Sequence, residues 1–352
     1  MSLRLYPYRL PFARPLRTAR GVLRTRRGWL LEWPLPGYVG WGDACWWQGC
    51  GGSSRGVRRA LADFAARADR LPSPAQAGSD PLDLEPWTRG LEGPARHAVA
   101  CAALDLRAQV AGVPLARLLN PSARARCASH VLVGGAAEAR AAAALGARAF
   151  KLKVGARRLA IDLQRVRELR DAVGPAATLR LDANGAWSRV EAAAVWPVLR
   201  ELGVDFVEQP LPATDLAGLR ALRGQGVGVA ADESLAQCGV EAVLAAEAAD
   251  VWILKPQALG GPDLAYLAGR RALQVGLQPV VTHALDSALG RRAAVHVACA
   301  LGQDHPHGLG DPFAEDVARV AAGGPRATGP GLGVAPTHTR LRFPRTPVEV
   351  GS

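Results

Sequence analysis

The sequence lacks the features of several protein classes. No apolar run approaches the roughly 18 residues that a membrane-spanning helix needs, and residues 1–20 have no apolar core of a signal sequence. The six cysteines are scattered without a Cys-x-x-Cys pair, which argues against a structural zinc site. We therefore expect a soluble, cytoplasmic protein with reduced thiols and no membrane partner.

Lysine is the scarcest of the basic residues. Of 43 lysines and arginines, only Lys151, Lys153 and Lys255 are lysines. The pKa of arginine, above ~12, keeps it protonated, whereas burial and neighbouring charges can lower the pKa of lysine to about 7 or 8. The three lysines therefore indicate where proton transfer is expected. The alternative is that they persist by chance in an arginine-rich sequence.

The net charge of +12 has two interpretations. A nucleic-acid-binding protein is one of them, but the arginines are spread along the chain and form no run with interleaved aromatic residues. We therefore expect no nucleic-acid partner and a small anionic carboxylate substrate, which a positive background favours. The oligomeric state is not determined by the sequence.

The amino-terminal part predicts an α+β domain. With 352 residues, the chain is long enough for one large barrel or two modest domains. Short strand patterns are followed by two alanine-rich helical stretches, with a Pro/Ser/Asp linker between the helices. These are strands near 3–6, 28–32 and 38–41, helices at 57–68 and 95–110, and the linker at 71–86. We predict a capping domain over residues 1–120, to which residues 325–352 return with a strand at 339–343.

After residue 120, short apolar segments alternate with helical stretches, as in a parallel α/β fold. Successive segments end at intervals of 29, 26, 24, 23 and 27 residues, the length of one βα unit. The ends are Lys153, Asp182, Glu208, Asp232, Lys255 and Thr282, with a further candidate strand at 308–310. An open doubly wound sheet gathers its ligand groups at one switch point, whereas a closed barrel uses the ends of all its strands. We therefore predict a (β/α)7β TIM-like barrel over residues 121–324.

Asp182, Glu208 and Asp232 end three consecutive predicted strands. They offer only oxygen ligands, the set that Mg²⁺ prefers and that Mn²⁺ also accepts, and leave coordination positions for a substrate carboxylate. A carboxylate that caps the following helix explains any one of them, but explains three in succession poorly.

Lys151 and Lys153 are two residues apart on one strand, so both side chains point to the same face. Two nearby ammonium groups lower each other's pKa, which makes one of them a candidate base. Lys255 would approach the substrate from the opposite side of a barrel. We predict these three lysines as the catalytic residues.

Five motifs in order resemble the enolase superfamily, muconate-lactonising-enzyme subgroup, over residues 125–315. The resemblance implies that the metal stabilises an enolate, that Glu233 orients Lys255 and that Asn184 supports the metal site. The motifs are Lys151-Leu-Lys153, Leu181-Asp182-Ala-Asn184-Gly-Ala-Trp187, Val207-Glu208-Gln209-Pro210, Ala231-Asp232-Glu233-Ser234 and Leu254-Lys255-Pro-Gln-Ala-Leu-Gly260-Gly261.

Within that subgroup the chain most resembles the o-succinylbenzoate synthase family, the dehydratases of menaquinone biosynthesis. The resemblance implies substrate contacts by Arg20, Arg180, Thr282 and His283. It rests on Arg180, on Pro15-Leu-Arg17-Thr18-Ala-Arg20-Gly21-Val22, similar to the mobile loop over that family's site, and on Thr282-His283-Ala-Leu-Asp286-Ser287-Ala-Leu-Gly290. The last segment departs from the family's Ser-Ser-x-x-Glu-Ser-x-x-Gly at Thr282, His283 and Asp286.

The implied reaction is the dehydration of 2-succinyl-6-hydroxy-2,4-cyclohexadiene-1-carboxylate to 2-succinylbenzoate. Lys153 would remove the α-proton and protonate the departing hydroxyl, while Lys255 stabilises the intermediate. An N-succinylamino acid racemase, or another racemase or epimerase of the subgroup, needs the same groups and stays the alternative. His283 is either a substrate contact or structural residue, or a base as in mandelate racemase.

Overall fold

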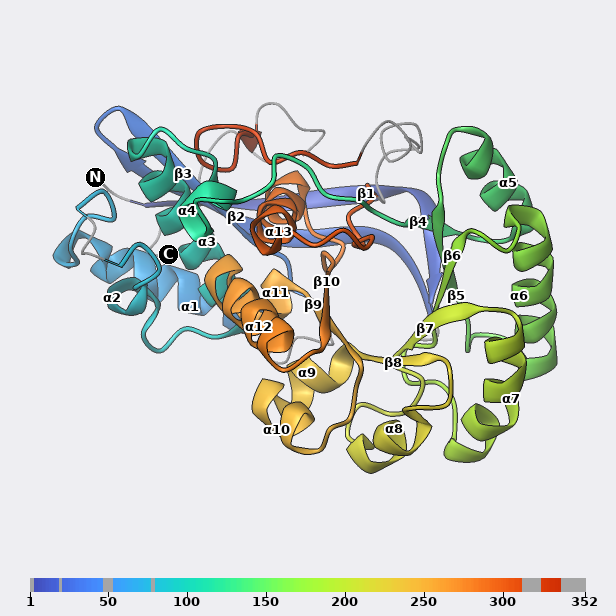
Figure 1. Cartoon of the computed structure of the whole chain (residues 1–352). Coiled ribbons are helices and arrows are strands. Elements are labelled where there is room, and N and C mark those ends of the chain that lie inside the picture. The colour runs from blue at the N-terminus through green and yellow to red at the C-terminus, as the bar shows by residue number, and fades with distance from the viewer. Residues whose placement is uncertain (1–2, 19–20, 47–52, 77–79, 312–323, 337–352) are drawn as a thin grey trace.

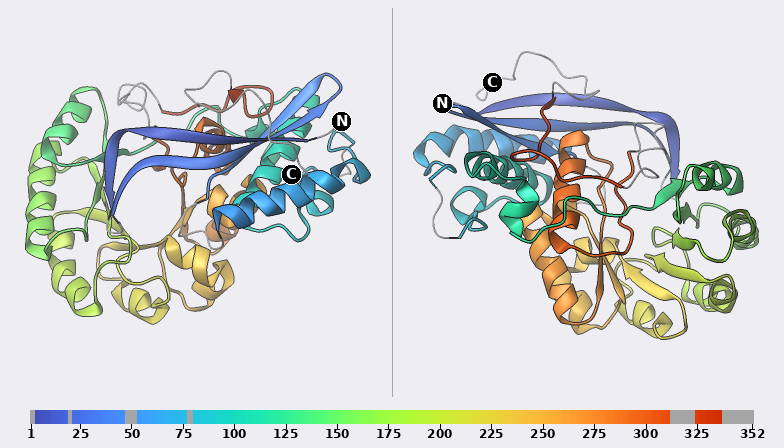
Figure 2. Two further views of the ribbon diagram at one scale, coloured as in Figure 1. Left: turned by 180° about the vertical axis from the view of Figure 1, so that it is seen from behind. Right: turned by 45° about the horizontal axis from the view of Figure 1, so that its top comes forward.

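A computed structural model of the chain describes residues 3–18, 21–46, 53–76, 80–311 and 324–336 (Figure 1). In this part of the chain the strands form an antiparallel sheet of three strands and a parallel sheet of seven. Figures 1 and 2 show that the parallel sheet is curled, with its helices on the outer face. The predicted α/β class is therefore confirmed.

The antiparallel sheet is built from a long hairpin and a shorter third strand. Its strands are β1 (Arg4–Thr18), β2 (Gly21–Leu35) and β3 (Tyr38–Ala44). β1 and β2 are longer than the predicted strands because the prolines of β1, interpreted as breakers, lie on an edge strand, where a missing N–H is tolerated. The hairpin extends across the molecule to the parallel sheet (Figures 1 and 2).

Helices cover one side of this antiparallel sheet, and the two predicted long helices are confirmed. The elements are α1 (Ser54–Arg67), η2 (Ala68–Arg70), α2 (Glu85–Thr88), α3 (Gly93–Val110) and α4 (Leu115–Leu119). α3 lies directly on β3 because glycines face it. A Cβ atom at Gly42 would lie 1.9 Å from the carbonyl oxygen of Ala98. This close approach fixes β3, and with it Asp43, against the rest of the protein.

The parallel sheet has the strand order β10-β9-β8-β7-β6-β5-β4. The strands are β4 (Val131–Val133), β5 (Ala149–Lys153), β6 (Thr178–Asp182), β7 (Val204–Glu208), β8 (Gly228–Ala231), β9 (Val251–Leu254) and β10 (Gln278–Val281). The helices are α5 (Ala136–Ala144), α6 (Leu159–Val173), α7 (Arg189–Glu201), α8 (Leu216–Leu222), α9 (Glu233–Cys238), α10 (Val240–Ala245), α11 (Pro256–Leu259), α12 (Pro262–Gln274) and α13 (Ala288–Leu301). The predicted strand ends at 153, 182, 208, 232, 255 and 282 therefore lie at or next to the ends of these strands.

The concave face of the sheet has its own small core. Five buried apolar residues form a cluster separate from the main core: Phe206, Ala230, Val251, Ile253 and Val280. Because side chains alternate along a strand, the residue two positions after an inward-facing residue also faces inward. Glu208, Asp232, Lys255 and Thr282 each follow a member of this cluster by two positions. The inner face thus has an apolar layer with a polar layer above it.

A short segment links the two edges of the parallel sheet. His307 forms an isolated parallel bridge with Ser129, and Gly308 forms one with Thr282 next to β10. His130 N donates to the carbonyl of His307 at 2.8 Å, and Gly308 N donates to the carbonyl of Val281 at 2.9 Å. The predicted strand at 308–310 is therefore represented by isolated bridges among the described residues.

Residues 324–336 lie against α3 and α4. Gly331 forms a bridge with Pro114, and Leu332 N donates to Asp105 Oδ1 at 2.7 Å. The predicted strand at 339–343 lies outside the described residues. No helix in the described part of the chain is long and apolar enough to cross a membrane.

Candidate active site

Three lysines and three carboxylates meet at the carboxyl ends of neighbouring parallel strands. Lys151 and Lys153 lie on β5, Asp182 ends β6 and Glu208 ends β7. Asp232 and Lys255 directly follow β8 and β9. The structure thus brings together all six residues that we predicted as metal ligands and catalytic lysines.

Ion pairs connect these six side chains. Lys151 Nζ lies 2.6 Å from Glu208 Oε2 and 3.1 Å from Asp182 Oδ2. Lys153 Nζ lies 2.8 Å from the same Asp182 oxygen, and Lys255 Nζ pairs with Asp232 Oδ2. The three carboxylate side chains are at most 5% exposed, whereas that of Lys153 is 24% exposed. Lys153 is therefore the most accessible of the six to a substrate.

The buried charges shift each other's protonation. Burial alone would lower the pKa of Lys151, but Asp182 and Glu208 outweigh it and raise this pKa. Burial would also lower the pKa of Lys255, but the charges of Asp232 and Glu208 outweigh it and raise this pKa. The ammonium group of Lys255 does act to lower the pKa of Lys151, but the two carboxylates outweigh it, so the predicted net lowering is not found for Lys151.

The carboxylates divide into two kinds. Burial opposes ionisation of Asp182, but Lys151 and Lys153 together hold its pKa well below the usual range. Burial and the charge of Asp182 raise the pKa of Glu208 to about 7 against the opposing effect of Lys151. Burial also raises the pKa of Asp232, although Lys255 opposes it. The lysines alone therefore do not supply enough positive charge to keep all three carboxylates ionised near neutral pH.

Asn184 connects Lys153 to the next layer of polar groups. Its Oδ1 accepts a hydrogen bond from Lys153 Nζ at 2.8 Å, and its Nδ2 donates to Glu233 Oε1 at 3.3 Å. Asn184 adopts a positive φ of 47°, a conformation that asparagine tolerates better than most residues. Glu233 also contributes to the raised pKa of Lys255. The two predicted supporting residues thus link the lysines on opposite sides of the site.

Gln209 is a supporting residue to which sequence reasoning assigned no role. Its Nε2 donates to the hydroxyl of Ser234 at 2.8 Å, while its Oε1 accepts from the backbone N–H groups of Asp232 and Ser234 at 3.1 and 3.0 Å. Gln209 is fully buried and has a φ of 40°. It follows Glu208 directly, so one residue orients the turn that carries Asp232. The quoted Glu208-Gln209-Pro210 motif contained the signal, but a buried amide cannot be told from an exposed one in sequence.

Arg180 does not fit its predicted substrate contact. It is 1% exposed, its Nε donates to Asp205 Oδ2 at 2.8 Å, and its guanidinium also donates to the carbonyl of Pro306. The guanidinium stacks 4.6 Å from the ring centroid of Phe206. Asp205 precedes Glu208 by three residues, or about 10 Å along the strand. Arg180 therefore reaches toward the amino ends of the strands, because Asp205 and Pro306 neutralise and bind it there.

The other predicted substrate contacts lie on the segment after β10 or outside the described residues. Thr282 Oγ1 is buried and has no hydrogen-bond partner within the described ranges. His283 Nδ1 accepts from Leu285 N at 3.1 Å, and its Nε2 donates to the carbonyl of Gly310 at 2.9 Å. Burial lowers the pKa of His283 to about 4. Both ring nitrogens are thus occupied, which favours the structural interpretation of His283 over a base. Arg20 lies outside the described residues.

The donor set fits a divalent cation, although the described residues do not converge into a three-ligand cluster. The ammonium group of Lys151 lies between Asp182 and Glu208, and that of Lys255 pairs with Asp232. The three carboxylates provide only oxygen, and burial, together with repulsion from Asp182 and Asp232, raises the pKa of Glu208. Such a set is stabilised by a hard cation such as Mg²⁺.

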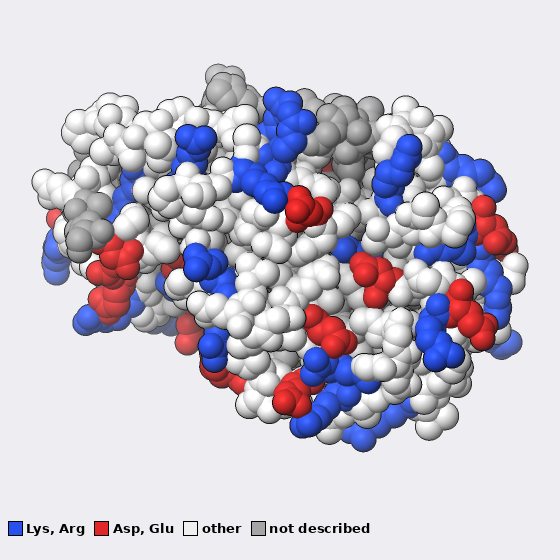
Figure 3. Space-filling view, in the orientation of Figure 1, with Lys and Arg blue, Asp and Glu red and all other residues white. Residues whose placement is uncertain are grey.

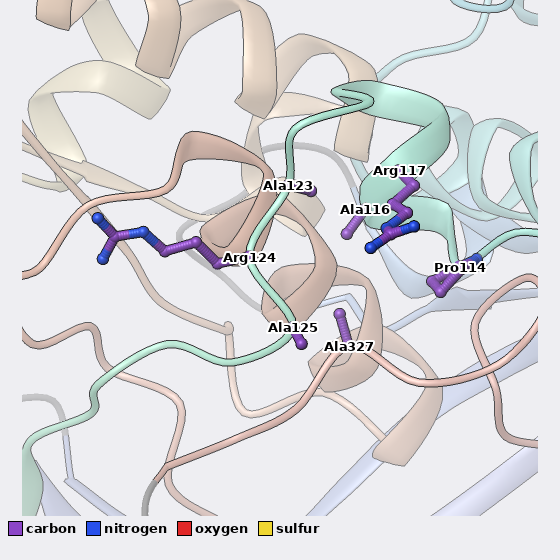
Figure 4. Close-up of a pocket in the computed structure, with 7 residues that line it drawn as sticks. All are labelled: Pro114, Ala116, Arg117, Ala123, Arg124, Ala125 and Ala327. Atoms are coloured by element: carbon purple, nitrogen blue, oxygen red, sulfur yellow. The ribbon is translucent and has the colours of Figure 1, made fainter.

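A surface view and a cavity among the described residues add no residues to this site. On the face in Figure 3, basic side chains are spread among acidic and uncharged ones. A cavity of about 230 Å³ lies between α4 and residues 123–125 and 327, and Arg124 points away from its centre (Figure 4). No predicted catalytic residue lines this cavity, so it is not the candidate active site. Its lining residues are Pro114, Ala116, Arg117, Ala123, Arg124, Ala125 and Ala327.

A curled parallel sheet with lysines and carboxylates at its carboxyl edge carries the groups needed for acid–base chemistry. The chain belongs to the enolase C-terminal domain-like family of the enolase superfamily, whose sequence model matches residues 135–340. This match confirms the resemblance noted in the sequence.

Two relatives carry different activities in their names. The chain is 42% identical to o-succinylbenzoate synthase from Mycobacterium tuberculosis over 186 residues, which cover 50% of this chain and 54% of that protein. It is 39% identical to chloromuconate cycloisomerase from a Pseudomonas species over 155 residues, which cover 43% of this chain and 42% of that protein. The chain thus spans about half the length of the curated relatives it matches.

Solved structures support the fold. The L-Ala-D/L-Glu epimerase from Bacillus subtilis aligns with a TM-score of 0.77 and 27% identity over 90% of this chain and 91% of that one. A dipeptide epimerase from Enterococcus faecalis, complexed with Mg and a dipeptide, aligns with a TM-score of 0.80 and 24% identity over 94% of this chain and 98% of that one. The second likeness shows the fold alone.

Proposed function

We propose that the chain is an o-succinylbenzoate synthase, a metal-dependent dehydratase that converts 2-succinyl-6-hydroxy-2,4-cyclohexadiene-1-carboxylate to 2-succinylbenzoate in menaquinone biosynthesis. The observation that supports it most directly is the arrangement of Lys153 at the end of β5 and Lys255 directly after β9, on either side of three buried carboxylates. The mycobacterial relative at 42% identity carries this activity in its name. That the cyclohexadiene substrate fits between these two lysines is part of the proposal.

We also propose the full architecture that this function needs. The parallel sheet would close into a (β/α)7β barrel over residues 121–324, as the bridges of His307 and Gly308 to both edges support. Residues 1–120 would form the capping domain, with residues 325–352 returning to it. The contacts of Gly331 and Leu332 with residues 114 and 105 support this division.

Asp182, Glu208 and Asp232 would hold Mg²⁺, for which Mn²⁺ could substitute. The metal would supply positive charge that stabilises an ionised substrate carboxylate and acidifies the carbon next to it. Lys151, with its raised pKa, stays charged and adds to the same field. It also balances the negative charge of Asp182 and Glu208.

Lys153 carries the proton transfer in this proposal. In its neutral form its Nζ accepts the proton from the α-carbon, and the resulting ammonium returns a proton to the hydroxyl that leaves as water. Asn184 Oδ1, 2.8 Å from this Nζ, orients the lysine. The charge of Lys255 stabilises the negative charge that develops on the opposite side, and formation of the aromatic ring favours the second step.

A racemase or epimerase of the same subgroup is the second candidate, since two lysines on opposite sides also suit proton exchange on both faces. The structural likeness to the Bacillus subtilis epimerase at 27% identity favours it. Against it, the stretch His307-Gly-Leu-Gly-Asp311 has no Asp-x-Asp of the kind expected in a dipeptide epimerase, and Asp311 pairs with Arg291 at 3.0 Å. An N-succinylamino acid racemase is not affected by this argument.

The deciding experiment is a magnesium-dependent assay of the purified protein with the cyclohexadiene substrate. Formation of the aromatic product is followed by absorbance, with EDTA as the blank. We expect rapid turnover that EDTA abolishes and added Mg²⁺ restores. If the protein binds Mg²⁺ but forms no aromatic product, the dehydratase proposal is wrong. Solvent deuterium exchange into N-succinylamino acids then tests the racemase.

A further inference from the structure

The antiparallel sheet reaches the segment that follows β10 through a buried polar cluster. This segment, residues 282–287, carries Thr282 and His283 and ends at Ser287, the N-cap of α13. Arg26 of β2 and Asp43 of β3 contact its backbone from the opposite sheet. Arg26 is 5% exposed and Asp43 is fully buried. Neither residue has a role in the mechanism above.

Arg26 binds two consecutive carbonyl groups of the segment. Its Nε donates to the oxygen of Leu285 at 3.2 Å, and its Nη2 donates to the oxygen of Ala284 at 3.1 Å. A guanidinium that binds two adjacent acceptors fixes both distance and direction, which a lysine cannot do with a single ammonium group. The backbone between His283 and Asp286 is thereby held from outside its own strand.

Asp43 holds the other end of the segment. Its Oδ2 accepts from the backbone N–H of Ser287 at 2.9 Å, and its Oδ1 accepts from the hydroxyl of Tyr8 at 2.8 Å. Asp286 is buried beside it: Asp286 Oδ2 and Asp43 Oδ2 each lie 3.0 Å from the position of a Cβ atom at Gly290. Asp286 is also near enough to Arg26 to act on its charge. The buried guanidinium therefore has two carboxyl groups as neighbours.

The segment needs this support because its backbone is strained. Leu285 has a φ of 59°, in the left-handed region that side-chain-bearing residues rarely adopt. Its N–H donates to His283 Nδ1, and its carbonyl accepts from Arg26. Strained residues persist where the surrounding structure over-determines them, and they concentrate at functional sites. The contact from β2 thus bears on the turn that sets the orientation of His283.

We propose that Arg26 is a positioning residue that holds residues 282–287 in the conformation that presents Thr282 to the substrate. The proposal rests on the proposed function in so far as Thr282 contacts the substrate. On this proposal the antiparallel sheet contributes to substrate affinity, through the buried contact of Arg26 with the backbone of the segment. The proton-transfer groups and the metal ligands do not depend on it.

The test compares the full-length Arg26→Met and Arg26→Lys variants with the wild-type protein. Arg27→Met is the matched control, because Arg27 is the next residue on β2 and its side chain is exposed. Hydrogen exchange of the backbone N–H groups of residues 284–287 reports on the segment directly. Steady-state kinetics with the cyclohexadiene substrate report separately on KM and kcat.

We expect Arg26→Met to accelerate exchange at Leu285 and Ser287 and to raise KM, each by about tenfold to a hundredfold, the effect of losing charge-assisted hydrogen bonds. The change in kcat should be several times smaller than the change in KM. Arg26→Lys, which keeps the charge and at most one of the two bonds, should fall between, and Arg27→Met should behave as the wild type. Arg26→Lys also provides the test if Arg26→Met does not fold.

Unchanged exchange in the folded Arg26 variants, or the same acceleration in Arg27→Met, would overturn the proposal. So would a loss confined to kcat. If the wild-type protein does not turn over the cyclohexadiene substrate, the proposed function fails by itself. The exchange experiment still decides whether Arg26 holds the segment.

Discussion

The two ends of the parallel sheet both bury charge, but they use different residues for it. At the carboxyl ends, three lysines lie among Asp182, Glu208 and Asp232. Toward the amino ends, Arg180 is bound by Asp205 and the carbonyl of Pro306 and stacks on Phe206. The chain has 40 arginines and three lysines, and all three lysines lie at the carboxyl ends. Only a lysine can exchange a proton there, as Lys153 would in the proposed mechanism. Toward the amino ends, the planar guanidinium of Arg180 has fixed partners and a structural role.

The sharpest test of this comparison replaces lysine with arginine at the carboxyl end. We expect Lys153→Ala and Lys255→Ala to abolish turnover, with kcat reduced roughly 10³-fold or more, because acid–base groups contribute about 10²–10⁴ and charge stabilisation adds to this. Lys153→Arg should be as inactive as Lys153→Ala, since arginine keeps its proton. Both alanine variants should remain folded by circular dichroism.

Arg157→Ala is the control, because Arg157 is exposed and lies in the loop after β5. It removes a positive charge near the same strand and should leave kcat unchanged. Substantial activity in either purified lysine variant would contradict the two-lysine mechanism.

The opposite result is expected at the amino ends of the strands. Arg180→Met should lower the free energy of unfolding by about 2–3 kcal/mol, because it breaks a buried ion pair and its hydrogen bonds. The kcat of the folded fraction should stay within about threefold of the wild type, because the hydrogen bonds of Arg180 go to Asp205, His130 and Pro306 and to none of the six site residues. Urea unfolding and kinetics on the same preparation measure both. A loss of turnover without a loss of stability would restore the predicted substrate contact.

Gln209 extends the comparison to neutral groups at the carboxyl end. Gln209→Met removes the bonds that orient the turn of Asp232, and loss of such supporting partners weakens metal affinity by about 10- to 100-fold. Calorimetric titration with Mg²⁺ measures this directly. Gln225→Met, at an exposed glutamine, should leave the affinity unchanged. Equal affinity in Gln209→Met would show that Asp232 is held by other contacts.

A buried histidine close enough to Arg180 to feel its charge gives this region its own pH dependence. Burial lowers the pKa of His307 well below its usual value, and His307 Nδ1 accepts from Val281 N at 3.0 Å. The unfolded state therefore binds more protons, so stability is complete above about pH 6.5 and is lost as the pH falls below that value. The stability advantage of the wild type over His307→Asn should shrink by about 2 kcal/mol between pH 7.5 and pH 5. A difference independent of pH, measured by urea unfolding, would contradict a buried neutral histidine.

Much of the site could be predicted from sequence because it depends on local rules. The two-residue spacing of Lys151 and Lys153 sets a common face, and the βα spacing brings Asp182, Glu208 and Asp232 to one edge. The long hairpin was missed because an edge strand tolerates proline, and its edge position is not visible locally. The role of Gln209 was missed for a similar reason, since its partners come from other strands.

The sequence by itself determined the kinds of chemistry available and their order along the chain: which strands end in carboxylates, which in lysines, and at what spacing. Only the tertiary structure decided the direction in which long side chains extend and which charged groups form ion pairs. Arg180 and Asp182 lie on the same face of one strand, yet the first reaches Asp205 and Pro306 while the second binds Lys151 and Lys153. Their partners come from segments distant in the sequence, so burial and opposite charge, acting through the folded chain, set the directions.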